Sequence, residues 1–176
     1  LNQRKRRSSL TVGVAFGGSG VAVVALRGSG RDGSPRLTHA THLSGAGEEE
    51  TGERLARWIE DNDLEKARTV GVIADADYQV IQVEAPPVPA SEMRRAAAWR
   101  VRDLIDFPLD QGVIDTFPVP ETAQRGQNNI NVVVARRAAV MERVEQLHRA
   151  RLRVDAIDIP ELVQRNVSTR LPDSRG

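Results

Sequence analysis

The most specific stretch of this sequence reads Ala98-Trp99-Arg100-Val101-Arg102-Asp103-Leu104-Ile105-Asp106-Phe107-Pro108-Leu109-Asp110, and after Gln111 it continues as Gly112-Val113-Ile114-Asp115. The first half of this stretch predicts the end of an amphipathic helix that a proline stops. A short turn and a strand over 112–119 are expected to follow. The rest of the chain can be placed around this order of helix, turn and strand.

Apolar residues at helical spacing define the extent of the helix. They recur at i, i+4, i+8, i+11 and i+12, so all of them are expected on one face. They are Met93, Ala97, Val101, Leu104 and Ile105. Ser91 is a credible N-cap, because its hydroxyl can accept a hydrogen bond from a free backbone N–H group. We expect the helix to end near Asp106, since Phe107 precedes a proline.

Composition limits the class of protein. The 176 residues suffice for one domain or for two small packed subdomains. The 25 basic residues nearly balance the 24 acidic ones, so the chain as a whole has no field that would attract nucleic acid or an anionic membrane. The absence of cysteine excludes disulfides and thiolate metal sites. No apolar run approaches the roughly 20 residues of a membrane-spanning helix, and we expect a cytoplasmic protein.

The residues before the helix predict a small sheet. Alternating or continuous apolar runs indicate strands over 10–16, 21–26, 36–43 and 68–74. The glycine turn Gly17-Gly18-Ser19-Gly20 joins the first two strands as a hairpin, and the third strand extends it to a meander. Acidic residues at 48–50 favour a helix start there, with Leu55, Trp58 and Ile59 on its inner face.

The order of elements predicts a mixed α/β fold with an insert. Prolines between 86 and 89 mark the crossing into an inserted subdomain of one helix and strands over 112–119 and 130–135. A helix over 138–149, a strand over 154–159 and a helix from 161 return to the core. The expected parts are a flexible basic tail at 1–9, a core subdomain at 10–78 and 137–171, an inserted αββ-type subdomain at 79–136 and a tail at 172–176.

Several short segments of the sequence resemble those of a known protein family. They are Trp99-Arg100-Val101-Arg102-Asp103-Leu104, Phe107-Pro108-Leu109-Asp110, Val113-Ile114-Asp115, Asn131-Val132-Val133-Val134-Ala135 and Ile157-Asp158-Ile159-Pro160-Glu161-Leu162. With these segments and this element order, the chain resembles the PilM-type proteins of type IV pilus assembly, and most nearly the MshI-like proteins of MSHA (mannose-sensitive haemagglutinin) pilus biogenesis. The resemblance spans roughly 10–171 and implies the first lobe of an actin-like (ribonuclease H-like) fold.

The resemblance also implies a function. In PilM-type proteins a short cytoplasmic peptide of an inner-membrane pilus protein binds beside the insert, so the expected role is a non-catalytic cytoplasmic scaffold held at the inner membrane by its partner. The family's second lobe would follow the last helix, so the alternatives are a cut chain and a natural short form. Because the initiator methionine is missing, we expect a cut or processed chain. A small oligomerising domain, which would form homo-oligomers through the face left by the second lobe, is a further alternative.

The glycine turn lies where the actin-like fold places its first phosphate-binding loop, and this makes Gly17, Gly18 and Ser19 candidate nucleotide contacts. Backbone N–H groups of such a turn can approach phosphate oxygens because no Cβ blocks them. In family members that bind nucleotide, an aspartate of the first strand serves Mg²⁺, whereas this chain has Ala15 there. A methyl group cannot hold a hard cation. An ATP-binding or kinase-like protein that uses ATP and Mg²⁺ with a second lobe stays as the alternative, and we expect no enzyme and no cofactor.

Other polar residues suggest no catalytic set. Asp75 with Asp77, and Asp155 with Asp158, lie near strand ends, where aspartate usually forms caps and turns. The three histidines are His39, His42 and His148, and the first two would point to opposite faces of one strand. Surface or packing roles account for all three.

Trp99, Arg100, Arg102 and Phe107 are the candidate partner-binding residues. Exposed aromatic and arginine side chains are enriched in the few residues that dominate binding at protein interfaces. Trp99 could instead fill the seam between the insert and the main subdomain. The spacing alone shows only an amphipathic helix.

Overall fold

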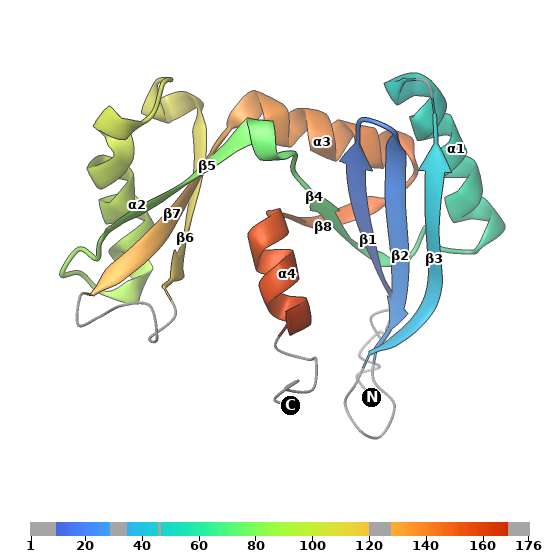
Figure 1. The fold of residues 1–176 in the computed structure, drawn as a ribbon, viewed down its shortest axis with the longest axis horizontal. Coiled ribbons are helices and arrows are strands. Elements are labelled where there is room, and N and C mark those ends of the chain that lie inside the picture. Colours follow the sequence, from blue (N-terminus) through green and yellow to red (C-terminus); the bar gives the residue numbers. More distant parts are fainter. Residues whose placement is uncertain (1–9, 29–34, 46, 120–127, 169–176) are drawn as a thin grey trace, which may run out of the picture. The chain divides into compact units, whose positions relative to one another are not determined.

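The computed structural model describes residues 10–28, 35–45, 47–119 and 128–168 (Figure 1). These residues form two compact units, one made of the chain up to Ala74 together with the chain from Glu142 onward, and one made of Asp75–Met141. The expected tails at 1–9 and 172–176 lie outside the described residues, as do residues 120–127 between the two predicted strands of the insert. None of the described helices is long and apolar enough to cross a membrane.

The first unit is built on a five-stranded sheet with the order β3-β2-β1-β4-β8. Its strands are β1 (Leu10–Gly17), β2 (Gly20–Arg27), β3 (Arg36–Ser44), β4 (Arg68–Val72) and β8 (Arg153–Asp158). The first three pair antiparallel, whereas β4 runs parallel to both β1 and β8. The predicted meander is confirmed, and so is the interior position of the strand that begins at Arg68.

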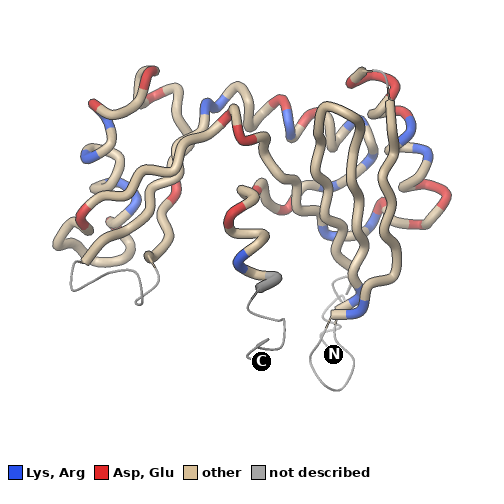
Figure 2. The backbone as a smooth tube through the Cα atoms, viewed as in Figure 1, with Lys and Arg blue, Asp and Glu red and all other residues tan. Residues whose placement is uncertain are grey.

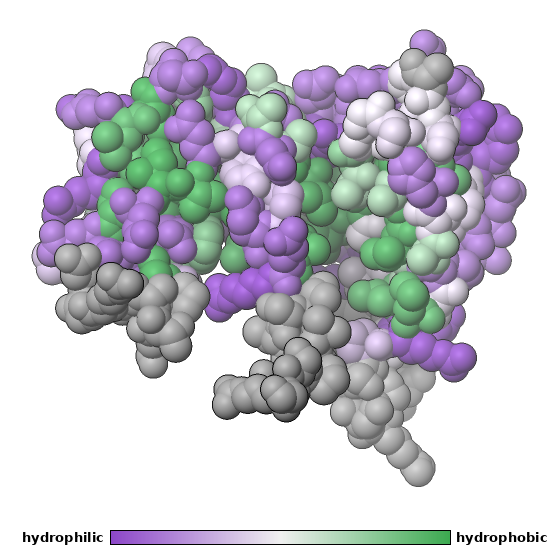
Figure 3. Space-filling view, viewed as in Figure 1, coloured by the Kyte–Doolittle hydropathy of each residue, from purple (hydrophilic) through white to green (hydrophobic). Residues whose placement is uncertain are grey.

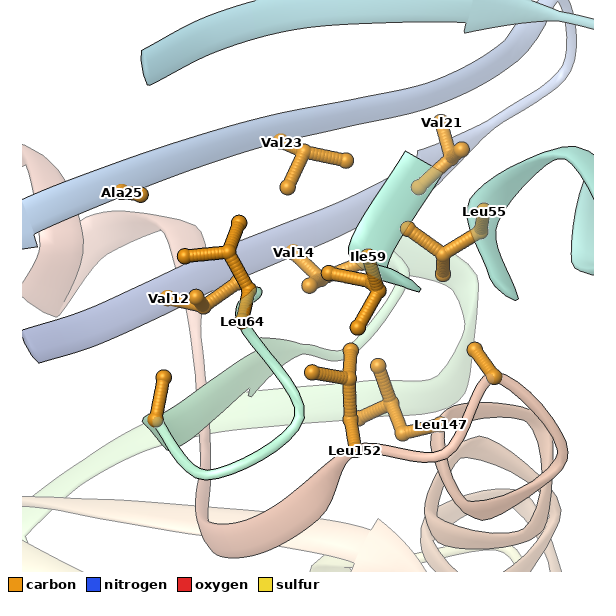
Figure 4. Close-up of a cluster of buried hydrophobic side chains, with 12 residues drawn as sticks. Val12, Val14, Val21, Val23, Ala25, Leu55, Ile59, Leu64, Leu147 and Leu152 are labelled. Carbon is orange, nitrogen blue, oxygen red and sulfur yellow. The ribbon is translucent and has the colours of Figure 1, made fainter. Parts of the chain in front are cut away.

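One face of this sheet packs against α1 (Glu48–Asp61) and the last turns of α3 (Arg137–Arg149). Alternation in β1 and β2 turns every second side chain to this face, which is why a strand pattern in the sequence becomes a buried layer. The core residues include Val12, Val14, Val21, Val23, Leu55, Ile59, Leu147 and Leu152, all at most 2% exposed (Figure 4). Leu55 and Ile59 are buried as predicted, and Trp58 is half-buried beside them.

The other face of the sheet is only partly covered. The helix α4 (Pro160–Ser168) follows β8, and Val163 of this helix shares a groove of about 650 Å³ with small and apolar residues of β1, β2 and β4. Val24 is 40% exposed and Leu37 is 56% exposed. Figure 3 shows hydrophobic residues at the surface over part of this sheet.

The second unit pairs a three-stranded antiparallel sheet with one helix. The strands β5 (Tyr78–Glu84), β6 (Gly112–Pro118) and β7 (Asn129–Arg136) have the order β5-β7-β6, and α2 (Ala90–Val101) covers one face. Ala97 and Val101 of α2 pack with Ile130, Val132 and Val134 of the central strand. Short 3₁₀ turns at η1 (Asp75–Asp77), η2 (Arg102–Leu104) and η3 (Leu109–Gln111) connect these elements.

The predicted bounds of the insert helix were partly wrong. The helix begins at Ala90 with Pro89 as its N-cap, rather than with Ser91 as the cap, and it ends at Val101 instead of near Asp106. The chain then tightens into η2, which has three residues per turn and rotates later side chains off the helical stripe. Met93 and Ile105 still pack against the core, but Leu104 is 58% exposed. The α-helical spacing therefore places three of the five predicted stripe residues within the helix itself.

The hairpin turn gives a direct test of the fold, because two of its glycines have different environments. Gly20 has φ of 141°, and a Cβ there would overlap the Leu43 carbonyl oxygen and come within 2.9 Å of the Ser44 Cα. Gly18 has no atom within 4 Å of its Cβ position.

We expect Gly20→Ala to lower the free energy of unfolding by about 2 kcal/mol or more, from backbone strain and overlap. Gly18→Ala is the matched control and should change it by less than about 0.5 kcal/mol. Urea denaturation of both variants measures the difference, and equal stabilities would contradict this account of the turn.

Candidate functional site

Trp99 lies on the outer face of α2. It follows the fully buried Ala97 by two residues, which is a rotation of about 200° around an α-helix. Its side chain is 62% exposed and belongs to neither hydrophobic core cluster. Trp99 is therefore a surface residue of the insert, and a core-filling role for it does not fit this exposure.

Arg102 lies over the ring of Trp99 and forms an ion pair with Asp103. Its guanidinium carbon lies 5.6 Å from the centre of the Trp99 ring, within the range of a cation–π interaction. Its Nε donates to Asp103 Oδ1 at 3.0 Å and its Nη2 donates to Asp103 Oδ2 at 3.4 Å. These hydrogen bonds, with the charge attraction they accompany, raise the pKa of Arg102 and hold the pKa of Asp103 below its ordinary value. Both oxygens of Asp103 thus accept from one guanidinium group at the exposed surface.

Phe107 does not join this exposed group. It is half-buried against the core of the second unit, and the Arg136 guanidinium carbon lies 4.4 Å from its ring centre. Arg136 Nη2 also donates to Asp106 Oδ2 at 3.1 Å, and Arg137 Nη2 donates to the Gly112 carbonyl at 3.0 Å. These contacts bind the segment after α2 to the end of β7. Phe107 thus anchors the segment, while Trp99, Arg100 and Arg102 are exposed.

Sequence reasoning missed two arginines of the same surface. Arg94 and Arg95 are exposed on α2, and Arg95, Trp99 and Arg102 are spaced at i, i+4 and i+7, which is a single helical stripe. Over residues 90–104 there are four arginines and only two acidic residues, Glu92 and Asp103. The basic segments of α2 are visible in Figure 2. The net charge of the whole chain is close to zero and does not report this local positive charge. A count of charged residues over the helix alone would have shown it.

The glycine turn lines a small hollow in the first unit. The hollow measures about 380 Å³, and its wall includes Gly17 and Gly18, but not Ser19, which is exposed. Arg143 lies in the wall with its guanidinium carbon 4.6 Å from the Phe16 ring centre, and it donates to Gln146 Oε1 at 2.7 Å. Glu48, the first residue of α1, contributes an opposite charge to the same wall. This mixture does not favour a phosphate group.

Ala15 faces away from that hollow. It lines the apolar groove between the sheet and α4, which it shares with Asp158. Asp158 Oδ1 accepts a hydrogen bond from the Ile159 backbone N–H at 2.9 Å, so this carboxylate caps the turn into α4. Ala15, at the position of the family's magnesium-binding aspartate, therefore does not line the glycine hollow. These residues do not fit Mg²⁺ with a nucleotide.

The remaining polar candidates have local structural contacts. Asp155 Oδ2 accepts from the Thr69 backbone N–H at 3.2 Å and lies 3.6 Å from Arg68 Nε. His39 packs edge-on against Trp58, with 6.0 Å between ring centres, while His42 and His148 are exposed. Asp75 and Asp77 belong to the 3₁₀ turn η1. Among the described residues, no three His, Cys, Asp or Glu side chains are grouped to hold a metal ion.

Comparisons with known proteins agree on the fold. No protein-family model and no curated protein matches the sequence. A solved structure described as a PilM–PilN type IV pilus biogenesis complex matches with a TM-score of 0.67 and 23% identity, over 88% of this chain and 48% of that one. The cytoplasmic domain of EpsL, an inner-membrane component of the type II secretion system of Vibrio cholerae, matches with a TM-score of 0.60 and 16% identity, over 88% of this chain and 58% of that one.

These likenesses confirm the expected fold class, a mixed α/β lobe with a small inserted subdomain, which both solved structures share. The chain spans about half the length of each of these two solved structures. At these identities the likeness concerns the fold, and it does not assign the activity or the partners of either protein to this chain.

The Arg102–Asp103 pair predicts a defined pH response. Because the folded-state pKa of Asp103 lies below its ordinary value of 3.8, the pair is complete above that value and is lost as the pH falls through the lowered pKa. We expect an NMR titration of the carboxyl carbon to give a midpoint below 3.8. Arg102→Gln should return the midpoint to the ordinary value, and Arg100→Gln serves as the control. A midpoint at or above 3.8 in the unaltered protein would contradict the observed pair.

Proposed function

We propose that this chain is a non-catalytic scaffold component of a pilus or secretion assembly machine. In this role it lies at the cytoplasmic face of the inner membrane and binds the cytoplasmic segment of an inner-membrane partner. The proposal is supported by the fold shared with proteins whose names place them in such machines. The single observation that carries it is the 62% exposure of Trp99 among arginines on a well-packed helix.

The physical basis is the binding energy that tryptophan and arginine side chains contribute when a partner covers them. Residues of these types account for much of the binding energy at many interfaces. Tryptophan buries a large area with little loss of conformational freedom, and arginine offers several hydrogen-bond donors to a partner. Covering the indole ring with a partner removes its apolar area from water, which is favourable. Arg102, whose guanidinium carbon lies 5.6 Å from the centre of the Trp99 ring, adds a charged donor group beside the indole on the same surface.

The non-catalytic part of the proposal has separate support. Ala15 offers no carboxylate to a metal ion, and the wall of the hollow at Gly17 and Gly18 carries both Glu48 and Arg143. Asp155 and Asp158 accept hydrogen bonds from nearby backbone N–H groups. These features favour a binding role over an ATP-dependent one.

The finer assignment within such machines is an MSHA-like type IV pilus. Its support is the sequence segments at 99–104, 107–110 and 157–162, which resemble MshI-like proteins. The resemblance also places the partner's peptide beside the insert, the unit that presents Trp99.

Calorimetry with the whole chain tests this function. The ligands are synthetic peptides that cover the cytoplasmic segments of single-span inner-membrane proteins encoded with the assembly system. One segment should bind, and Trp99→Ala should weaken it by about 30-fold, which corresponds to about 2 kcal/mol. Arg102→Ala should weaken it less, by about two- to fivefold.

The control variant is Val80→Ala, which removes a 38% exposed apolar side chain from β5 of the same unit. It should bind as the unaltered protein does, and circular dichroism should show that all variants are folded. If Trp99→Ala and Arg102→Ala both bind with unchanged affinity, the outer face of α2 is not the docking surface.

A further inference from the structure

The outer face of α2 has a strong local charge with few internal partners. Arg94, Arg95 and Arg100 are exposed, and within the part of the chain that the structure describes no ion pair involves them. Arg102 alone is paired, with Asp103. Arg95 and Arg102 lie on one stripe with Trp99, and Arg94 and Arg100 flank that stripe on either side of the helix. Together they give the exposed surface of α2 a positive charge that favours the approach of an anionic group.

All the basic residues of this face are arginines. The planar guanidinium group presents a rigid fork of N–H donors that matches a carboxylate, whereas lysine offers a point charge. Asp103 already demonstrates the geometry within the chain, because its two oxygens accept from Nε and Nη2 of Arg102. The surface therefore has the chemistry of a carboxylate receptor.

An apolar anchor lies within the same stripe. Trp99 lies between Arg95 and Arg102 in the i, i+4, i+7 order, and Leu104 just beyond it is 58% exposed. A partner that supplied only acidic side chains would leave these apolar groups in water. A partner with an apolar side chain between acidic ones would cover the indole ring and pair the arginines together.

We infer that the partner segment recognised by α2 is acidic, with an apolar side chain that packs on Trp99 between the arginines. This inference rests on the proposed function and names the chemistry of its ligand. In single-span proteins, Lys and Arg predominate within about 15–20 residues of the cytoplasmic end of the spanning helix. The recognised acidic motif therefore lies farther from the membrane than that basic region.

A protein segment fits this surface better than a lipid bilayer does. Helices that lie in a membrane interface bury their apolar face in it. In α2 that face, with Ala97 and Val101, is already buried against β7. Trp99 and Leu104 alone do not form the broad apolar stripe that such insertion requires.

Asp103 makes the inference testable in an unusual direction, because it competes with the partner for Arg102. Asp103→Asn should release Arg102 and strengthen binding of an acidic peptide by about two- to fivefold. Asp110→Asn is the matched control, since it removes the same charge from exposed η3 without freeing an arginine. Arg95→Glu should weaken binding by about tenfold, because it replaces attraction with repulsion.

The probe is a short peptide that alternates Glu and Leu, compared with a charge-reversed peptide that alternates Lys and Leu. Binding to the full chain is measured by calorimetry, and by the emission of Trp99 in a Trp58→Phe background that leaves it as the single tryptophan. The Glu–Leu peptide should shift the emission to shorter wavelength, and its affinity should fall as salt screens the charges. The Lys–Leu peptide should not bind.

Equal binding of the two peptides, or an Asp103→Asn variant no tighter than the unaltered protein, would overturn the inference. So would a Trp99 shift with vesicles of phosphatidylcholine and phosphatidylglycerol but none with the Glu–Leu peptide. Trp99-dependent binding of a neutral or basic membrane-protein segment would overturn it as well, yet leave the proposed function intact. Failure of every cytoplasmic segment to bind, while the Glu–Leu peptide binds as predicted, would instead count against the proposed function.

Discussion

The packing of Ala97 and Val101 on Val132 and Val134 determines what the insert presents to its surroundings. Two small side chains four residues apart bring α2 close to the central strand β7, and this contact fixes the rotation of the helix about its axis. With that face buried, a side chain two residues away from Ala97 must point outward. The exposure of Trp99 is therefore a consequence of core packing, and a helix rotated to hide Trp99 would expose Val101.

The contacts after α2 preserve that arrangement at the helix end. Arg136 stacks on Phe107 and pairs with Asp106, and Arg137 holds the Gly112 carbonyl. The two aromatic residues of this stretch thus have different roles, because Phe107 ties the segment to the sheet and Trp99 stays available. In the first unit Gly20 has a comparable function, since it ends the turn between β1 and β2 and lets the start of β2 pair closely with the end of β3 at Leu43 and Ser44.

Much of the fold could be predicted from the sequence, because strand alternation and helical spacing report directly on burial. The meander, the inner face of α1 and the interior position of β4 followed from residues such as Val12, Leu55 and Ile59. The end of α2 could not be predicted, since no residue before Pro108 signals the change to a 3₁₀ turn at Arg102. The candidate site was half predicted: Trp99 and Arg102 were identified, whereas Phe107 faces inward and Arg95 becomes visible as a neighbour only once the helix is drawn.

The central claim is that the outer face of α2 docks the cytoplasmic segment of a membrane partner. Photo-crosslinking in intact cells tests it most directly, with a benzophenone amino acid at position 99 and, as a control, at the exposed position 80 of β5. The account predicts an adduct from position 99 alone, which mass spectrometry maps to an acidic cytoplasmic stretch of a single-span inner-membrane protein. Adducts only with a second copy of this chain, or equal labelling from both positions, would contradict it.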